Sequence, residues 1–222
     1  MKLFIIVAVV SGSTIGLWII GRLTHAFHIL RVRGSANEPT IRPGKFIFIT
    51  NLKKPRRFDL VSYRAVVPPV GMTILTHRLC GMPGDMLEIK AGVLYVNGQN
   101  ADKPLRLQHI FKIPVTDSEA IEYDQKQAYT IPPYTNTLYI ALEDRRVSRE
   151  KLNCDRYVLP PGLRDEDIYM VFKQNWNRDH FGPLRVPKGT WFLLGDNRGN
   201  SRDSRQFGLV GQSKYLGTVL FK

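Results

Sequence analysis

The chain of 222 residues contains only two cysteines, Cys80 and Cys154, which lie far apart in the sequence. Neither cysteine has the spacing of a metal site, and Cys80 lies within an apolar strand pattern. Two buried thiols are therefore favoured over a disulfide. Without a crosslink or a structural metal, stability must come from a hydrophobic core, and the roughly 200 residues after the first segment are enough for one.

Acidic residues are also scarce, because 19 Asp and Glu stand against 32 Lys and Arg, for a formal net charge of +13. Such an excess of positive charge favours binding to nucleic acid or to an anionic membrane surface. The basic residues are scattered, apart from one short cluster that is typical of a solvated loop, formed by Lys53, Lys54, Arg56 and Arg57. No nucleic-acid-binding signature accompanies the cluster, so we expect a lipid bilayer and no nucleic acid as partner. The alternative hypothesis of a membrane-tethered protein that binds nucleic acid is supported by net charge alone.

Common cofactor and metal motifs are absent as well. There is no P-loop, dinucleotide fingerprint or HExxH motif, and four of the five histidines show no ligand spacing, namely His25, His28, His109 and His180. We therefore expect no cofactor and no metal. Hydrophobic residues make up 43% of the chain and charged residues 23%, a composition that favours a folded core over disorder.

One long uncharged run stands at the amino terminus. Residues 3–21 contain no charged side chain and are bracketed by Lys2 and Arg22. A helix of that length reaches about 28 Å, close to the hydrocarbon thickness of a bilayer. Residues 1–22 are therefore predicted to form a single-pass transmembrane anchor. A cleaved signal peptide is the alternative, but no small-x-small site follows the run cleanly.

Beyond a connector at 22–28, the pattern changes from helix to strand. Alternating or apolar runs predict strands at 29–33, 45–50, 58–63, 74–80, 168–173, 190–194 and 215–221. Residues 86–90 and 93–96 are predicted to form a hairpin that turns at Ala91 and Gly92, and Asn97-Gly98 marks the next turn. The predicted fold class is mainly β, with antiparallel sheets and many tight turns.

Residues 99–185 have weaker periodicity and more Pro, Asp and Arg than the segments around them, with short helices such as 117–127. We interpret this stretch as an inserted lobe. The chain then divides into the anchor at 1–22, a first part of the core at 23–98, the lobe at 99–185 and a second part of the core at 186–222.

Three polar stretches interrupt the strand pattern, at 34–41, 76–85 and 195–208. Taken alone, each has a structural interpretation: Pro-Gly-Asp at 83–85 is a turn signal, and the third stretch suits a loop in which Asp and Arg pair. Together, in this order and behind an anchor, they resemble signal peptidase I, the membrane-bound S26 serine peptidases. That family has a Gly-Ser-Met-Glu-Pro-Thr box, a Lys-Arg box that ends in Pro-Gly-Asp, and a closing Gly-Asp-Asn-Arg box.

The resemblance extends over residues 1–98 and 186–222 and hardly covers the middle lobe. The hairpin at 93–98 matches the family's Val-Leu-Tyr-Val-Asn-Gly segment, and the closing box matches from Gly195 to Arg205 except for Gly199. The resemblance implies an antiparallel β catalytic domain with an inserted lobe. It also implies a serine endopeptidase that cleaves N-terminal signal peptides from exported preproteins after small residues.

The nucleophile position departs from the family's pattern. Members usually cut with a serine three residues before the proline of the first box, and three residues before Pro39 stands Ala36. Ser35 is its neighbour, but adjacent side chains on an extended backbone face opposite sides. Two interpretations stay open. Either the loop is shifted so that Ser35 attacks, or the chain is an inactive peptide-binding or accessory protein.

His77 stands where the family usually has a lysine base. Imidazole has an unperturbed pKa of about 6.5, so it can act as a base without the desolvation that lysine needs. The period of two puts His77 on the face of Leu75 and Leu79 and predicts that it points inward. A hydrogen-bonded core histidine is the structural alternative, but the Arg-x-x-Gly-x-Pro-Gly-Asp that follows favours a site.

A histidine base needs an orienting partner, and the closing box offers candidates. Asp203 and Asp196 can supply a carboxylate, and Ser201 can hydrogen-bond the base. Asp203 has an alternative role in a structural salt bridge with Arg205 or Arg78. The catalytic set is therefore predicted to be Ser35, His77 and Asp203, supported by Arg78, Asp196, Ser201 and Arg205.

The substrate and the topology follow from the same resemblance. The preprotein would bind as an extended strand beside Ala36, Asn37 and Pro39, and a backbone N–H in the 34–36 turn would help hold the oxyanion. The resemblance implies a catalytic domain on the outer (trans) face of the cell membrane. A count of basic residues on the two sides of the anchor favours the opposite orientation.

Overall fold

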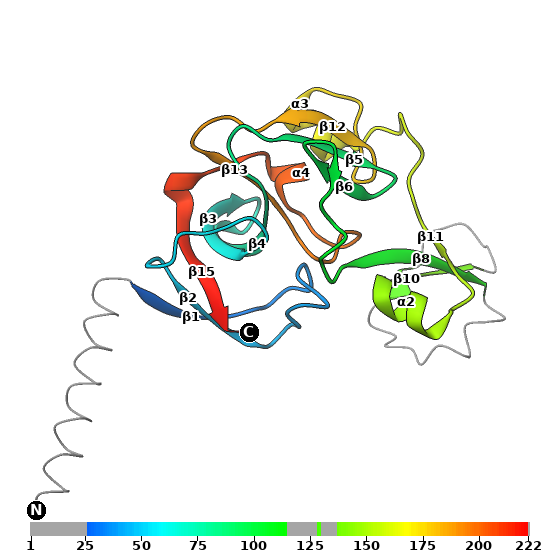
Figure 1. Cartoon of the computed structure of the whole chain (residues 1–222), viewed down its shortest axis with the longest axis horizontal. Coiled ribbons are helices and arrows are strands. Elements are labelled where there is room, and N and C mark those ends of the chain that lie inside the picture. Colours follow the sequence, from blue (N-terminus) through cyan, green and yellow to red (C-terminus); the bar gives the residue numbers. More distant parts are fainter. Residues whose placement is uncertain (1–25, 115–127, 130–136, 222) are drawn as a thin grey trace, which may run out of the picture.

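The computed structural model describes residues 26–114, 128–129 and 137–221. Within these ranges the chain is built mainly from strands (Figure 1). In chain order the elements are β1 (Phe27–Arg31), β2 (Phe46–Thr50), β3 (Leu60–Val67), β4 (Gly71–Gly81), β5 (Met86–Lys90), β6 (Val93–Val96), β7 (Gln99–Asn100), β8 (Gln108–Pro114), β9 (Ala128–Tyr129), β10 (Thr137–Glu143), α2 (Asp144–Glu150), β11 (Asp155–Arg156), α3 (Glu166–Phe172), β12 (Phe181–Arg185), β13 (Thr190–Leu194), α4 (Ser204–Phe207), β14 (Val210–Gly211), the 3-10 helix η3 (Gln212–Lys214) and β15 (Tyr215–Phe221).

The largest sheet has seven strands in the order β1-β2-β15-β3-β4-β13-β14. The last strand of the chain, β15, lies between β2 and β3, so that the two ends of the described chain share one sheet (Figure 1). The hairpin of β3 and β4 is long, and its register pairs Leu60 with Arg78 and Val67 with Gly71. Since β4 carries the histidine of the second motif, this hairpin is the base of the candidate site.

A four-stranded sheet, β12-β5-β6-β7, packs against this part of the molecule. Its buried side chains join those of β13 and α3 in one cluster that includes Leu87, Leu94, Ile168, Phe181 and Phe192. Phe181 packs at right angles to Phe172, with ring centroids 5.0 Å apart. This core supports the closing loop, because that loop follows β13 directly.

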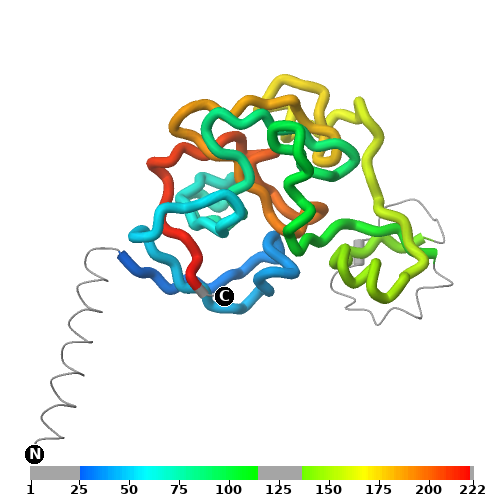
Figure 2. The backbone as a smooth tube through the Cα atoms, viewed as in Figure 1, coloured from blue at the N-terminus to red at the C-terminus, as the bar shows by residue number. Residues whose placement is uncertain are grey.

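Another four-stranded sheet, β11-β8-β10-β9, lies to one side of the seven-stranded sheet together with α2 (Figures 1 and 2). Its apolar cluster is separate and contains Phe111, Ile113, Ile140 and Leu142. All four residues fall within the predicted lobe at 99–185. The lobe boundary itself stays a prediction, because α3 and β12 belong to the same range but pack on the main core.

Most of the predicted strands are confirmed. The hairpin at 86–90 and 93–96, the strand at 190–194 and the strand at 215–221 have the predicted bounds, and the other amino-terminal strands differ by a few residues at their ends. Pairing between the strands is antiparallel throughout the described ranges. The mainly β, antiparallel fold class is therefore confirmed.

The strand predicted at 168–173 is wrong, because this segment lies in helix α3. Asp165 is the N-cap and accepts a hydrogen bond from the Ile168 N–H, while Glu166 and Asp167 supply acidic groups to the first turn. A short, continuously apolar run has no visible period, so its sequence fits a strand and a helix equally. The N-cap residue and the two acidic residues after it distinguish this helix from a strand.

Two predicted features lie outside the described residues, namely the anchor at 1–22 and the short helix at 117–127. Among residues 26–114, 128–129 and 137–221, no helix combines the length and the apolar character needed to cross a bilayer.

The two cysteines are both free. Cys80 is fully buried, and burial raises the pKa of its thiol to about 12. Cys154 is only partly buried, so the prediction of two buried thiols is correct for Cys80 alone.

Candidate active site

The three polar stretches of the sequence meet at one place. The turn after β1 is tied to the closing loop, because the Asn197 N–H donates to the Ala36 carbonyl at 2.9 Å. The same turn is tied to β4, where Asn37 Nδ2 donates to the Thr76 carbonyl at 2.6 Å, one residue before His77. The turn, the histidine strand and the acidic loop therefore form one polar centre.

Gly195 allows this close approach. A Cβ at this position would lie 2.4 Å from the Ala36 carbonyl oxygen and 2.2 Å from Ser201 Oγ. Distances this short do not occur between real atoms of this kind, and the first of them is to backbone. A glycine is therefore required for the first turn and the closing loop to touch.

The Ser35 hydroxyl points to the closing loop. Asn200 Nδ2 donates to Ser35 Oγ at 3.0 Å, and among the described residues no hydrogen bond joins Ser35 to His77. Ser35 and Ala36 are both partly exposed. Their backbone N–H groups have no acceptor in the part of the chain that the structure describes, so they are free to bind a ligand oxygen.

The other predicted peptide-binding positions lie in the same turn. Pro39 is partly exposed, whereas Asn37 is buried at 3% exposure. The Asn37 Oδ1 atom is buried and lacks a hydrogen-bond partner among the described residues. An unpaired buried amide oxygen costs free energy, which makes it a candidate acceptor for a peptide N–H.

His77 points inward, as the period of the strand predicts, and is 2% exposed. On the neighbouring strand β3, Val61 lies opposite it in the register. His77 Nδ1 is 2.9 Å from Tyr63 Oη, and Nε2 is 3.5 Å from Ser201 Oγ, the outer limit of a hydrogen bond. Both ring nitrogens therefore face hydroxyl groups.

The surroundings of His77 favour the neutral imidazole. Burial lowers its pKa below the ordinary value of 6.5. The carboxylates of Asp203 and Asp196 act in the opposite direction, and the Arg205 guanidinium adds to the lowering. Burial dominates, so His77 is uncharged at neutral pH and its ring holds a single proton.

Asp203 does not hydrogen-bond to His77 among the described residues. Its carboxylate receives the Gly195 N–H at 3.0 Å and two bonds at 2.9 Å from the Arg205 guanidinium. It also caps helix α4 through a capping box with Gln206. Of the two roles considered for Asp203, the ion pair with Arg205 is the one present, and its effect on His77 is through charge.

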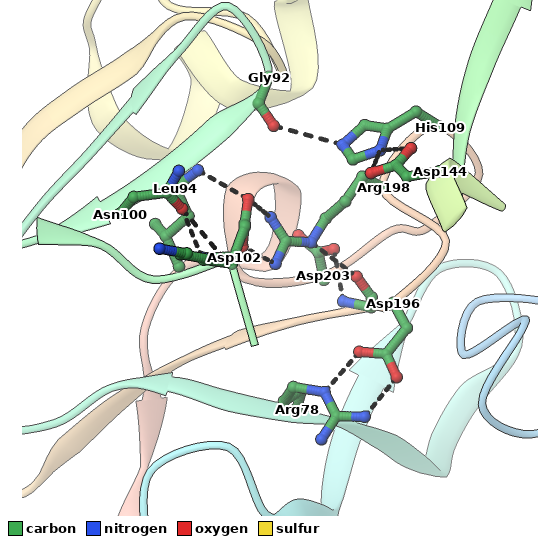
Figure 3. Close-up of polar contacts among 12 residues, drawn as sticks. Arg78, Gly92, Leu94, Asn100, Asp102, His109, Asp144, Asp196, Arg198 and Asp203 are labelled. Atoms are coloured by element: carbon green, nitrogen blue, oxygen red, sulfur yellow. Dashed lines mark hydrogen bonds and ion pairs between the residues drawn. The ribbon is translucent and has the colours of Figure 1, made fainter. Parts of the chain in front are cut away.

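Burial alone would raise the pKa of Asp203, but the charge and hydrogen bonds of Arg205 hold it below the ordinary value. Asp196 also lies in an ion pair, in which Arg78 Nε donates to its carboxylate at 2.6 Å (Figure 3). The pair of Arg78 and Asp196 links β4 to the closing loop, whereas the pair of Arg205 and Asp203 lies within that loop, and neither pair involves the histidine ring.

Two residues at the site were missed in the sequence. Arg198 forms a bidentate pair with Asp102, at 2.6 and 2.9 Å, and so fastens the closing loop to the turn after β7 (Figure 3). Tyr63 is the hydrogen-bond partner of the candidate base. Arg198 could have been noticed within its motif, whereas Tyr63 resembles any apolar strand residue until the register is known.

Comparisons with known proteins show the family of the chain. The family model for signal peptidase, peptidase S26, matches residues 3–222, so the chain belongs to this family of peptidases. Signal peptidase I of Bacillus caldolyticus is 27% identical over 195 residues, which cover 86% of this chain and 76% of that protein. Signal peptidase I of Bacillus amyloliquefaciens is 25% identical over 194 residues, which cover 86% and 70%. A crystal structure of signal peptidase I from Enterococcus faecalis matches 76% of this chain and 98% of that chain at 24% identity, with a TM-score of 0.36, too low to bear on the fold.

Proposed function

We propose that this protein is a membrane-anchored serine endopeptidase that cleaves N-terminal signal peptides from exported preproteins after small residues. The observation that carries the proposal is the meeting of three segments around His77, in a chain that belongs to the S26 family. The relatives are named signal peptidase I, which supports a signal peptide as the substrate. The anchor at 1–22 would hold the domain at the outer face of the cell membrane, beside the emerging peptide.

Ser35 is the proposed nucleophile. Its Oγ would attack the scissile carbonyl carbon while His77 takes the hydroxyl proton, and the imidazolium would then protonate the leaving amine. Water would hydrolyse the resulting ester by the reverse proton transfers. Because Ser35 Oγ accepts a hydrogen bond from Asn200, the reaction requires this hydroxyl to rotate toward His77 when a peptide binds.

The supporting residues have distinct proposed roles. The free N–H groups of Ser35 and Ala36 would bind the developing oxyanion. Ser201 would orient the imidazole from its Nε2 side, and the Asp203 carboxylate would favour the imidazolium through its charge. Arg78 and Arg205 would hold the two carboxylates in place. No cofactor takes part in this scheme.

A second candidate function is binding of a signal peptide without cleavage. The observation in its favour is that Ala36 stands three residues before Pro39, while the neighbouring Ser35 hydroxyl is bound to Asn200 instead of His77. With no hydroxyl at the attacking position, the turn after β1 would bind the peptide without cleaving it, and the chain would act as an accessory protein.

Incubation of the detergent-solubilised full chain with a preprotein separates the two functions. We expect cleavage after a small residue by the wild type, its loss in Ser35→Ala, and its retention in Ser213→Ala, a matched change at an exposed serine of η3. Cleavage that survives Ser35→Ala and disappears in Ser201→Ala would transfer the nucleophile role to Ser201. Peptide binding without cleavage would support the accessory function, and absence of both would overturn the proposal.

A further inference from the structure

The hydrogen bond between Tyr63 and His77 decides what the imidazole can do. Tyr63 lies on β3 with 2% of its surface exposed, within a core cluster that includes Val61, Leu79 and Trp191. The register pairs Val61 with His77, so Tyr63 and His77 are diagonal neighbours on the same face of the hairpin. Their rings are tilted at 44° with centroids 5.9 Å apart, which lets the phenol oxygen reach Nδ1 edge-on.

Tyr63 is the donor in this bond. Burial, with a smaller contribution from the Asp203 carboxylate, raises the pKa of Tyr63 far above its ordinary value, so the phenol keeps its proton. Among the described residues, His77 Nδ1 is the sole hydrogen-bond partner of the Tyr63 hydroxyl. If the imidazole donated instead, the phenol O–H would be buried without an acceptor, which is unfavourable.

We propose that Tyr63 is a positioning residue that fixes the neutral His77 ring as its Nε2–H tautomer, so that Nε2 enters the site as a hydrogen-bond donor. Since Nδ1 uses its lone pair to accept the phenol proton, the single ring proton must lie on Nε2. That proton points at Ser201 Oγ, 3.5 Å away. The inference rests on the proposed function, because it specifies the state of the proposed base.

A serine–histidine site needs the opposite tautomer. There Nε2 accepts the serine proton, and Nδ1–H donates to a carboxylate that holds the ring in place. Here no carboxylate among the described residues hydrogen-bonds to the His77 ring. Asp203 accepts hydrogen bonds from Arg205 and from the Gly195 N–H, and Asp196 accepts from Arg78. In the resting protein Nε2 therefore has no free lone pair with which to accept a proton.

Cleavage then requires one rearrangement of the ring. The proton leaves Nε2 for solvent, another is taken up at Nδ1, and the Tyr63 hydroxyl turns away, with no change in net charge. Tyr63 opposes this step because its hydroxyl would lose its partner. Tyr63 thus restrains the peptidase, and the restraint has about the strength of one buried hydrogen bond, a factor of roughly five in the tautomer equilibrium.

The tautomer can be read directly by NMR on the detergent-solubilised full chain with ¹⁵N-labelled histidine, and His77→Gln identifies the His77 signals among those of five histidines. At neutral pH we expect a protonated Nε2 and an unprotonated Nδ1. In Tyr63→Phe we expect the Nδ1–H form to gain population and the pKa of His77 to rise, because the neutral ring loses a donor. Tyr215→Phe is the matched control, since Tyr215 packs against the same cluster but its hydroxyl bonds to Thr218 and the Lys53 carbonyl.

The kinetic consequence is a rise in kcat of about fivefold in Tyr63→Phe with KM unchanged, and no change in Tyr215→Phe. A protonated Nδ1 in the wild type, or a fall in kcat in Tyr63→Phe, would overturn the inference. A wild type that has the Nε2–H ring and shows no cleavage would uphold the inference about Tyr63 and overturn the proposed function. A wild type that cleaves and has an Nδ1–H ring would overturn the inference and support the proposed function.

Discussion

His77 and His109 are both almost fully buried, at 2% and 4% exposure, yet different groups hold their rings. His109 on β8 has the Asp144 carboxylate 2.8 and 3.0 Å from Nδ1, and the Gly92 carbonyl 3.4 Å from Nε2 (Figure 3). Both of its nitrogens face oxygen acceptors, so a proton on either nitrogen is satisfied. The ring joins β8 to α2 and to the turn between β5 and β6, which is a structural task.

His77 faces hydroxyl groups on both sides, from Tyr63 and Ser201. A hydroxyl donates or accepts, so such partners permit a proton to be exchanged at the ring. Burial therefore does not distinguish the proposed catalytic histidine, His77, from a structural one, His109. The chemistry of the partners does, and the two sites can be told apart by substitution.

The largest expected effect is on cleavage. We expect His77→Gln to lower the rate of preprotein cleavage at least about 100-fold, since general-base catalysis contributes that much or more. His109→Gln makes the same chemical change at the other buried histidine and is expected to keep the rate near that of the wild type. The measurement is cleavage by folded, detergent-solubilised protein at neutral pH. Equal losses in the two variants would remove the distinction drawn between the two histidines.

A smaller effect is expected on stability at the other site. His109→Gln should lower the free energy of unfolding by about 1 to 3 kcal/mol, because the Asp144 carboxylate loses a hydrogen bond. Urea unfolding of His109→Gln, Asp144→Asn and the double variant forms a double-mutant cycle. A coupling energy near zero would mean that the pair does not hold β8 to α2.

The smallest effect is a dependence of stability on pH. The pKa of His77 is lowered by burial in the folded state, so below about pH 6.5 the unfolded chain binds a proton that the folded chain does not. Stability should therefore fall as the pH falls from about 6.5 toward the folded-state pKa, and the cleavage rate should fall at lower pH, as His77 of the folded protein takes up its proton. Urea midpoints at about pH 5 and pH 7 measure the effect. His77→Gln should remove part of this dependence, and an unchanged dependence in that variant would assign it to other groups.

Much of the fold could be predicted from local pattern. The hairpin at 86–96 follows from alternation and from Gly and Asn at turn positions, and the strand at 190–194 follows from a short apolar run; these signals act over a few residues. Helix α3 was missed because its apolar run has no period, although Asp165 marks its start. The inward direction of His77 was predictable for the same local reason as the strands.

Sequence alone determined the antiparallel β class, the three motifs of the site and the presence of a histidine where the family has lysine. Only the tertiary structure decided the partners of these residues: Asn200 at Ser35, Arg205 at Asp203, and Tyr63 at His77. The reason is physical. Alternation and turn chemistry are local, whereas hydrogen bonds such as Asn200 to Ser35, 165 residues apart, depend on strand register and on how the loops dock.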